Sequence, residues 1–597
     1  METSAEHGVQ RLQALAHSAV MGMPGTDVGV TRERVRRRRL RRVAIVLVPV
    51  AVWLWVRIIL GEARLPGMPH VPSTLVPFIP AVVLSLLLGL MLIGPLLGAG
   101  RSPHVLYRPS EIDVRLEDVR GAGTVVEEVV KTLNLFLAHR TFSERMGGSP
   151  RRAVLFEGPP GTGKTYMAKA MAAEAGVPFL FVSSSAFQSM FYGQTNRKIR
   201  SYFRALRAYA RREGGAIGFI EEIDAIGTSR SGMSSGRGEG VAGVVNELLV
   251  QLQSFDQPTF GVRLAGRFVD AVNGWLPPAR HLRKPRTRAA NILIIGATNR
   301  AADLDPALVR PGRFDRTITF DAPGRAGRRD IIDFYLDRKA HDAELDDPAR
   351  RDALAALTFG HTPVMIERLL DEALVWALRR GSDRLSWSDL QKAKLTEEIG
   401  LAQDVEYAEA ERRLIATHEA GHATVAWLVG KGRKLEVLSI VKRKNALGLL
   451  LHTDEEERFT RTRSEVEALV DIALGGMAAE QIFFGETSTG ASSDLQAATN
   501  IVCHMVGAYG MGGSLVSSMA IETPGRANLV AKVLGTDAGR EEVDKILSAA
   551  RSRAVTMLDA HLCVVEALRD ALLERDELSG EEIADVIAAA RGPVPVG

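Results

Sequence analysis

Two long apolar stretches lie close together near the start of the chain. The first, residues 43–61, contains one charged side chain, Arg57, and the second, residues 65–100, contains no Asp, Glu, Lys or Arg. A helix needs about 20 apolar residues to cross the hydrocarbon core of a bilayer. The second stretch meets this length, whereas the first is marginal because Pro49 interrupts it and Arg57 has to reach the interface. The pattern predicts a hairpin of two transmembrane helices, residues 43–100, with a short outer loop.

The rest of the chain carries short apolar runs and helical periods. Runs typical of buried strands stand at residues 153–157, 216–224 and 291–296. After a linker at 101–114, we expect a large α/β subdomain at 115–322 and a helical lid subdomain at 323–400. Residues 401–597 predict a separate, mainly α-helical domain, in which residues 436–452 form two strands that flank a turn.

Charge is concentrated at one end of the chain. The 75 Lys and Arg and 71 Asp and Glu give a net charge of +4. Residues 32–42 hold eight Arg and one Glu, so this segment contributes +7 and the remainder sums to −3. Such a run also occurs in nucleic-acid-binding and nuclear-targeting segments. Its position directly before an apolar stretch favours a basic cytosolic segment, residues 1–42, with both chain ends in the cytosol.

The amino-acid composition excludes several classes of protein. The chain is 46% hydrophobic and 24% charged, which argues against wholesale disorder. Its two cysteines, Cys503 and Cys563, exclude a disulfide scaffold and a Cys₄ zinc site.

A phosphate-binding loop follows the strand at 153–157. The sequence GPPGTGKT comes directly after this strand and leads into a helical pattern, which is the context that a P-loop requires. Glycines let backbone N–H groups approach phosphates, Lys164 neutralises the β- and γ-phosphates, and the Thr165 hydroxyl reaches Mg²⁺. The predicted loop consists of Gly158, Pro159, Pro160, Gly161, Thr162, Gly163, Lys164 and Thr165.

Two adjacent carboxylates, Glu221 and Glu222, end the apolar strand pattern within residues 216–224. We expect Glu221 to hold Mg²⁺ through water and Glu222 to polarise the water that attacks the γ-phosphate. Asn299, at the end of a later strand, can orient the same water. An aspartate is usual at the first position, so Glu221 adds one methylene where position affects the hydrolysis rate.

A pair of histidines lies in the helical pattern of residues 408–429. His418 and His422 are four residues apart, so they share one helix face and can bind one Zn²⁺. Glu419 is placed to take the proton of a zinc-bound water. The same spacing also occurs by chance in helices, and a catalytic zinc needs a third protein ligand.

These motifs, and the order in which they follow one another, resemble those of known protein families. GPPGTGKT, FIEEIDA, ATNR and LVRPGRFDR resemble the motifs of AAA+ ATPases. HEAGH, LGGMAAEQIFFG at 474–485 and STGASSDL at 488–495 resemble the protease domain of the FtsH family, which are membrane-anchored AAA+ zinc metalloproteases. The folded domain usually present between the two transmembrane helices is replaced here by a short loop.

The resemblance implies further roles. It makes Asp494 the third zinc ligand, where a helix N-terminal role is the alternative, and Glu480 a support for a ligand histidine. It implies a ring, usually a hexamer, in which Arg310 and Arg313 reach the nucleotide of the neighbouring subunit; a solvated arginine pair is the alternative. A pore loop that grips the substrate, with core packing as the alternative, would consist of Phe191, Tyr192 and Gly193.

Two segments depart from the family pattern. Residues 257–289 look like an insertion with seven basic residues and one acidic residue, Asp270. We expect a solvated loop there, and contact with anionic lipid or a partner is the alternative. Residues 364–367, Val-Met-Ile-Glu, stand where the family has a Gly-Ala-Asp-Leu sensor element.

These observations predict a membrane-anchored ATP-dependent zinc metalloendopeptidase that unfolds and degrades membrane and misfolded cytosolic proteins. The expected cofactors are one Zn²⁺ per subunit, ATP and Mg²⁺, and the expected partners are protein substrates, membrane lipid and further copies in a homohexamer, with no nucleic acid. The expected location is a bacterial cytoplasmic membrane, with the ATPase and protease domains in the cytosol. The alternatives are a membrane chaperone or remodelling ATPase with little proteolysis, and a peptidase whose motor is slowed by Glu221.

Overall fold

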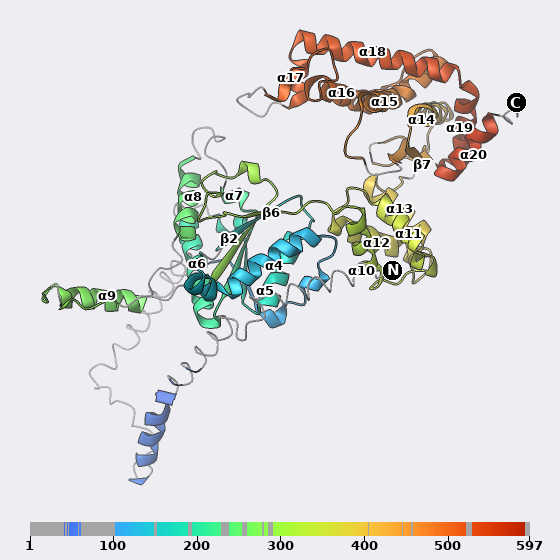
Figure 1. Cartoon of the computed structure of the whole chain (residues 1–597). Helices are drawn as coiled ribbons and strands as arrows, with labels where there is room; N and C mark the ends of the chain where they lie inside the picture. Colours follow the sequence, from blue (N-terminus) through green and yellow to red (C-terminus); the bar gives the residue numbers. More distant parts are fainter. Residues whose placement is uncertain are drawn as a thin grey trace, which may run out of the picture. The chain divides into compact units, whose positions relative to one another are not determined.

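A computed structural model shows the arrangement of the chain (Figure 1). It divides into two compact units, residues 1–338 with 360–367, and residues 339–359 with 368–597. The described residues are 37, 41, 44–45, 47–57, 59–60, 102–148, 152–188, 194–227, 238–253, 260–277, 280–284, 290–403, 405–444, 446–454, 458–520 and 528–591.

A six-stranded sheet forms the centre of the first unit, in the order β1-β3-β4-β5-β2-β6. The edge strand β1 is antiparallel to β3, and all other neighbours are parallel. The central strands are buried on both faces, which explains their continuous apolar sequences. The strands are β1 (Val105–Tyr107), β2 (Ala153–Glu157), β3 (Phe179–Ser183), β4 (Ala216–Glu221), β5 (Ile292–Thr298) and β6 (Thr317–Thr319).

Strand β1 corrects one predicted boundary. It lies within residues 101–114, which we expected to be a linker, and pairs Val105 with Phe181 of β3. The three residues of β1 are too few to show the alternation of side chains along the sequence by which a strand is predicted. The sheet supplies the reason for its formation, because β3 would otherwise expose unpaired backbone groups at this edge.

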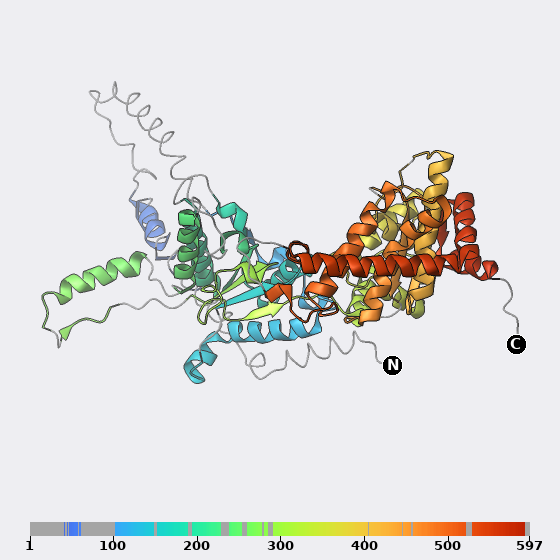
Figure 2. The same ribbon diagram turned by 90° about the horizontal axis from the view of Figure 1, so that it is seen from above.

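Helices cover both faces of this sheet (Figures 1 and 2). Side chains alternate along each strand, so Phe156 packs with helices α4 and α5 whereas Leu155 packs with α6 and α8. A further helix, α9, occupies part of the segment expected to be a solvated loop, and that expectation is wrong for these residues. These helices are α4 (Gly123–Leu137), α5 (Lys164–Ala175), α6 (Gln194–Glu213), α7 (Asp224–Gly227), α8 (Gly238–Gln253) and α9 (Phe260–Asn273).

The segment predicted as a helical lid is helical. Asp347 caps α11 by accepting from Ala349 N, and Ser386 and Asp389 form a capping box at the start of α13. Its helices are α10 (Arg325–Leu336), α11 (Pro348–Leu357), α12 (Pro363–Arg379) and α13 (Trp387–Glu398).

The C-terminal part is mainly helical, as predicted, with a small antiparallel sheet in the order β8-β7-β9. The two predicted strands are β7 (Arg433–Ser439) and β8 (Leu449–Asp454). The third strand, β9 (Glu577–Ser579), lies between two helices and was not predicted. It follows Asp576, which has a φ of +60° and ends α19. The helices are α14 (Glu409–Val429), α15 (Arg463–Phe484), α16 (Ser492–Gly507), α17 (Leu529–Leu534), α18 (Asp537–Asp559), α19 (Leu562–Arg575) and α20 (Gly580–Ala590).

Parts of the N-terminal predictions fall outside the described residues. The first apolar stretch is helical at residues 44–45, 47–57 and 59, and the second stretch lies outside the description. Within the described part of the chain, no helix combines the length and apolar character needed to cross a membrane. The predicted pore residues Phe191, Tyr192 and Gly193 also lie outside the described residues.

Candidate nucleotide and metal centres

The predicted P-loop connects β2 to α5 at the carboxyl edge of the parallel sheet. Gly158 has a φ of +149°, and a Cβ added to it would lie 2.0 Å from the carbonyl oxygen of Phe320. No other residue fits there, because the loop must pass directly over the end of a neighbouring strand segment.

Lys164 and Asn299 meet beneath this loop. Lys164 Nζ donates to the carbonyl oxygens of Gly158 and Pro159, at 2.7 and 2.8 Å, and to Asn299 Oδ1 at 2.8 Å. Burial lowers the pKa of Lys164, and the nearby Glu221 and Asp224 oppose this shift. A cationic amine held by neutral carbonyl groups is suited to an anionic phosphate.

The two carboxylates at the end of β4 have different environments. The Thr165 hydroxyl donates to Glu221 Oε1 at 3.0 Å, so the two predicted Mg²⁺-binding groups are adjacent. Glu222 has a φ of +52°, which is unusual for a residue other than glycine, and Ser184 Oγ donates to its carbonyl oxygen at 2.5 Å. Backbone strain of this kind is typical of functional sites.

These residues line one pocket of about 390 Å³. Val364, the first residue of the divergent sensor element, also lines it, and Val364 N lies 3.4 Å from the carbonyl oxygen of Gly161. The lining consists of Pro160, Gly161, Gly163, Lys164, Thr165, Tyr166, Glu221, Glu222, Ala297, Thr298, Asn299 and Val364.

The two predicted arginine fingers do not line this pocket. Arg310 is exposed, and Arg313 donates from Nη1 to the carbonyl oxygen of Ala307 at 2.6 Å. An exposed arginine is available to a neighbouring molecule, whereas the bond of Arg313 holds the turn around it.

The predicted metal ligands converge in the C-terminal domain. His418 Nε2 lies 3.0 Å from Asp494 Oδ2 and 3.0 Å from His422 Nε2, and the three ligand atoms lie within 4.8 Å of one another. Among the described residues this is the one cluster of three or more His, Cys, Asp and Glu side chains that could hold a metal ion. The structure therefore brings together residues separated by 76 positions in the sequence.

The opposite ring nitrogens fix the tautomers of both histidines. His418 Nδ1 lies 2.7 Å from Glu480 Oε1, and His422 Nδ1 lies 2.7 Å from the carbonyl oxygen of Ile472. In a neutral ring, each of these acceptors favours a proton on Nδ1, which leaves the Nε2 lone pair to bind a metal. Two lone pairs and a carboxylate repel one another unless a cation lies between them, and this donor set suits Zn²⁺.

In the absence of a metal, the same contacts determine the pKa values of His418 and Asp494. Burial opposes a charge on His418, but the bonds to Asp494 and Glu480 outweigh it and raise the pKa of His418 to about 10. Burial opposes a charge on Asp494 as well, but the two histidines lower its pKa. A cation is thus favoured at this point of the domain.

Glu419 lies beside the cluster and is buried. Burial raises the pKa of Glu419, which increases its affinity for a proton. A Cβ added to Gly448 would lie 2.6 Å from Glu419 Oε1, so the chain just before β8 passes directly against this carboxylate. Sequence reasoning missed Gly448, because no local pattern links it to Glu419.

Helices α14 and α15 approach closely at the metal cluster. A Cβ on Gly421 would lie 2.5 Å from the carbonyl oxygen of Gly475, and a Cβ on Gly476 would lie 2.4 Å from His418 Nε2. Sequence reasoning gave these glycines no role. The signal was present, since two adjacent glycines inside a helix are costly unless a close contact requires them.

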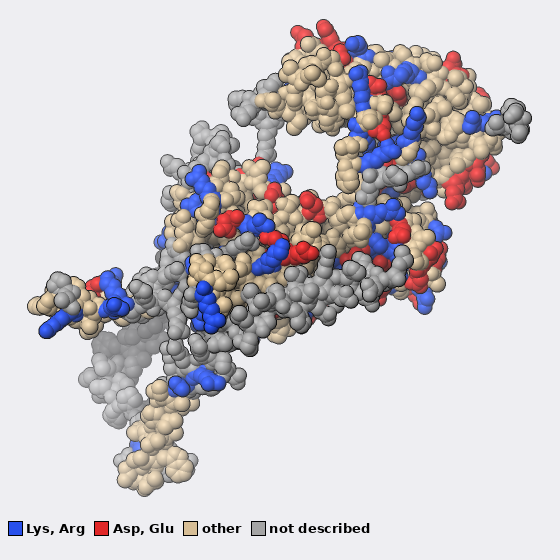
Figure 3. Space-filling view, viewed as in Figure 1, with Lys and Arg blue, Asp and Glu red and all other residues tan. Residues whose placement is uncertain are grey.

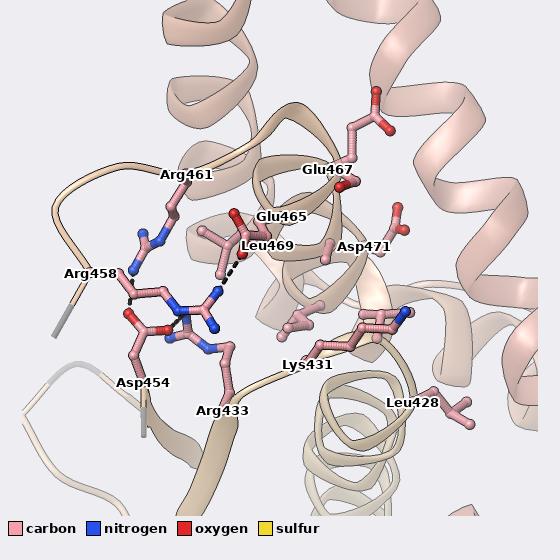
Figure 4. Close-up of a pocket in the computed structure, with 15 residues that line it drawn as sticks. Leu428, Lys431, Arg433, Asp454, Arg458, Arg461, Glu465, Glu467, Leu469 and Asp471 are labelled. Carbon is pink, nitrogen blue, oxygen red and sulfur yellow. Dashed lines mark hydrogen bonds and ion pairs between the residues drawn. The ribbon is translucent and has the colours of Figure 1, made fainter. Parts of the chain in front are cut away.

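A second cavity, of about 300 Å³, lies where α14 leads into β7 (Figure 4). Three arginines from two segments, β7 and the residues just before α15, gather there. Arg433 and Arg461 bind Asp454, at 2.8 and 2.6 Å, and Arg458 pairs with Glu465. Arg433 Nε also donates to Nδ1 of His452, at 2.9 Å. This cluster fixes the end of the β7–β8 pair.

The two centres together define a class of protein. A P-loop nucleotide site and a zinc-type His-His-Asp cluster with an adjacent glutamate, on one chain, are the parts of an ATP-driven peptidase.

Comparison with known proteins agrees with this class. Residues 154–322 match the ATPase family associated with various cellular activities (AAA), and residues 405–586 match Peptidase family M41. The ATP-dependent zinc metalloprotease FtsH 1 of Symbiobacterium thermophilum is 33% identical over 566 residues, which cover 90% of this chain and 86% of the relative. The ATP-dependent zinc metalloprotease FtsH of Thermotoga maritima is 31% identical over 507 residues, which cover 82% and 75%.

The chain belongs to the FtsH family of ATP-dependent zinc metalloproteases. Zn²⁺, and ATP with Mg²⁺, are accordingly its cofactors.

Proposed function

We propose that this protein is a membrane-anchored protease that uses ATP to unfold membrane and misfolded cytosolic proteins and to feed them to a zinc-dependent peptidase site. The observation that carries the proposal is the convergence of His418, His422 and Asp494 beside Glu419, on a chain that also has a complete P-loop. A chaperone without proteolysis is not favoured, because it has no use for a buried glutamate beside three metal ligands.

His418, His422 and Asp494 are the proposed zinc ligands, and Glu480 and the Ile472 carbonyl hold the two rings in place. Bound zinc supplies a Lewis acid that polarises the peptide carbonyl and lowers the pKa of a coordinated water. Glu419 takes a proton from the attacking water on its carboxylate and passes it to the leaving nitrogen, as the C–N bond of the peptide breaks. The carboxylate ends each cycle deprotonated.

The nucleotide site is proposed to drive translocation. Gly158, Pro159, Pro160, Gly161, Thr162, Gly163, Lys164 and Thr165 cradle the phosphates, and Glu221 and Thr165 hold Mg²⁺. Glu222 and Asn299 orient the attacking water. The hydrogen bond from Thr165 to Glu221 supports this role for a glutamate in place of the usual aspartate, because it brings the two proposed Mg²⁺-binding side chains together.

The AAA domain assembles into oligomers, and we propose a homohexamer. Exposed Arg310, with Arg313, would reach the γ-phosphate bound by the next subunit. Phe191, Tyr192 and Gly193 would line the central pore and grip unfolded chains. The substrate would then add to the sheet at β8, whose outer edge has no neighbouring strand in the described sheet.

The proposed location is a bacterial cytoplasmic membrane. Residues 43–100 would form the two-helix anchor, and the arginine run at 32–42 would keep residues 1–42 in the cytosol. Both termini and both enzymatic domains would then share the cytosolic side.

Proteolysis of casein by the detergent-solubilised chain tests the proposal. Degradation should require ATP and stop with a zinc chelator or with Glu419→Gln, while Glu419→Gln should retain ATP turnover. Glu411→Gln is the matched control, because Glu411 is an exposed residue on the same helix. Undiminished degradation by Glu419→Gln would refute the peptidase assignment. ATP turnover no faster than that of Glu222→Gln would refute the motor.

A further inference from the structure

Helix α9 carries a large exposed apolar face. Leu264, Phe268 and Trp275 are 58%, 72% and 92% exposed. A spacing of four residues places Leu264 and Phe268 on one side of α9, together with Ala271. Trp275 lies in the turn that follows the end of the helix at Asn273. A group of exposed apolar residues of this kind is typical of a surface that contacts another molecule or a membrane.

Basic residues flank this apolar face and follow the helix. Arg267, Arg280, Arg283 and Lys284 are exposed, and Asp270 is the sole acidic residue between positions 257 and 289. Lys284 Nζ already binds Asp270 Oδ1 at 2.7 Å. In Figure 3 the surface of α9 is tan and blue with little red. We call residues 260–277 and 280–284 the basic amphipathic segment.

The sheet places the start of β5, the strand that follows this segment in the sequence, near the start of the described ATPase domain. Val105 of β1, Phe181, Phe219 and Ile295 stand in one row across four strands. With strand spacings of about 4.8 Å and about 3.3 Å per residue, Val105 and the start of β5 at Ile292 lie roughly 18 Å apart. The segment precedes β5, and the predicted membrane anchor ends five residues before Val105.

We propose that the basic amphipathic segment binds the surface of an anionic lipid bilayer. Its apolar face lies at the boundary of the acyl chains, and its arginines bind lipid phosphates. Leu and Phe on one face, Trp just beyond the helix end, and Lys and Arg around them form the pattern of interfacial helices. Charge complementarity selects anionic lipid. The inference is independent of proteolysis and of the zinc site.

Fluorescence quenching in nanodiscs tests this contact on the full chain. In a Cys563→Ser background, with Cys503 buried, an environment-sensitive dye is attached to Ala271→Cys on the apolar face. Gly266→Cys is the matched control, since it lies on the polar face and an added Cβ there meets nothing within 4 Å. The discs contain lipid with a headgroup-level spin-label quencher, either in phosphatidylcholine alone or with phosphatidylglycerol.

The expected result is several-fold stronger quenching at position 271 than at position 266 in phosphatidylglycerol discs, and weak quenching at both in phosphatidylcholine. Arg267→Glu with Arg283→Glu, or 0.5 M salt, should reduce quenching at position 271 several-fold. ATP turnover equal to wild type verifies folding of the variants, because none of these residues lines the nucleotide pocket.

Two outcomes would overturn the proposal. Equal quenching in both lipids, unaffected by charge reversal, would exclude recognition of anionic lipid. A dye at position 271 that is already in an apolar environment in detergent, and is not quenched by the labelled lipid, would show that protein covers this face instead.

Discussion

Glu480 Oε1 lies 2.7 Å from His418 Nδ1, on the side of the ring opposite to Asp494. Glu480 is fully buried and also accepts from the backbone N–H and hydroxyl of Ser488. Burial opposes its ionisation, but these bonds and the histidine lower the pKa of Glu480. One carboxylate therefore joins the metal-binding helix α14 to the segment that leads to Asp494.

Glu480→Gln should weaken zinc binding by about 10- to 100-fold, because a neutral amide orients His418 less strongly and lowers its basicity. Competition with a fluorescent chelator measures the affinity. Glu486→Gln, at an exposed site just beyond the same helix, is the control and should not change it. Unchanged affinity in Glu480→Gln would show that this contact does not support the ligand.

Gly448→Ala should separate chemistry from metal binding. The added methyl would lie 2.6 Å from Glu419 Oε1, so the carboxylate must move, whereas the zinc ligands keep their places. We expect proteolysis to fall by at least about tenfold, because a general base typically contributes about 10²- to 10⁴-fold to the rate and the displaced carboxylate loses part of this. Zinc content and ATP turnover should stay normal. Gly513→Ala is the control, since its nearest contact would be 3.5 Å. Loss of zinc in Gly448→Ala would contradict this separation.

The local motifs predicted the chemistry of the nucleotide and metal centres, because that chemistry depends on the sequence spacing of residues within one helix or one loop. His418 and His422 needed only the helical period, and Lys164 only the loop that precedes it. The family resemblance supplied Asp494. Gly448 and the Arg433–His452 contact depend on strand register, and β9 depends on an edge offered by β7. Tertiary pairing of this kind leaves no periodic trace in the sequence.

His452 should make the domain less stable at mildly acidic pH. Burial and the adjacent Arg433 lower the pKa of His452 to about 4. The unfolded chain binds a proton below its ordinary pKa of about 6.5, while the folded chain does not until about pH 4. Stability therefore falls as the pH drops from 6.5 towards 4, by up to about 2 kcal/mol at pH 5.

His452→Gln should remove this part of the pH dependence, because glutamine does not titrate and still accepts from Arg433. Melting temperatures between pH 7.5 and 5 measure it, and the difference between variant and wild type isolates His452 from the metal ligands. If the melting temperatures of the two proteins changed with pH in parallel, a depressed pKa of His452 would be contradicted.

A buried ion pair links the lid helix α13 to the sheet of the peptidase domain. Lys394 Nζ lies 2.8 Å from Glu436 Oε2 on β7, and the two side chains are 5% and 16% exposed. The Thr453 hydroxyl on β8 donates to the other oxygen of Glu436, at 2.6 Å. Lys394→Met would leave this carboxylate buried without its cation, at a cost of about 3–5 kcal/mol.

The double variant Lys394→Met with Glu436→Gln should recover most of that loss, since the amide still accepts from Thr453 and no charge remains buried. Urea unfolding followed by zinc release measures all four members of the cycle. A coupling energy near zero would mean that the pair is solvated and that α13 is held to β7 by other contacts. Strong coupling with unchanged ATP turnover, but reduced proteolysis, would identify the pair as a link that positions the β7–β8 edge beside Glu419.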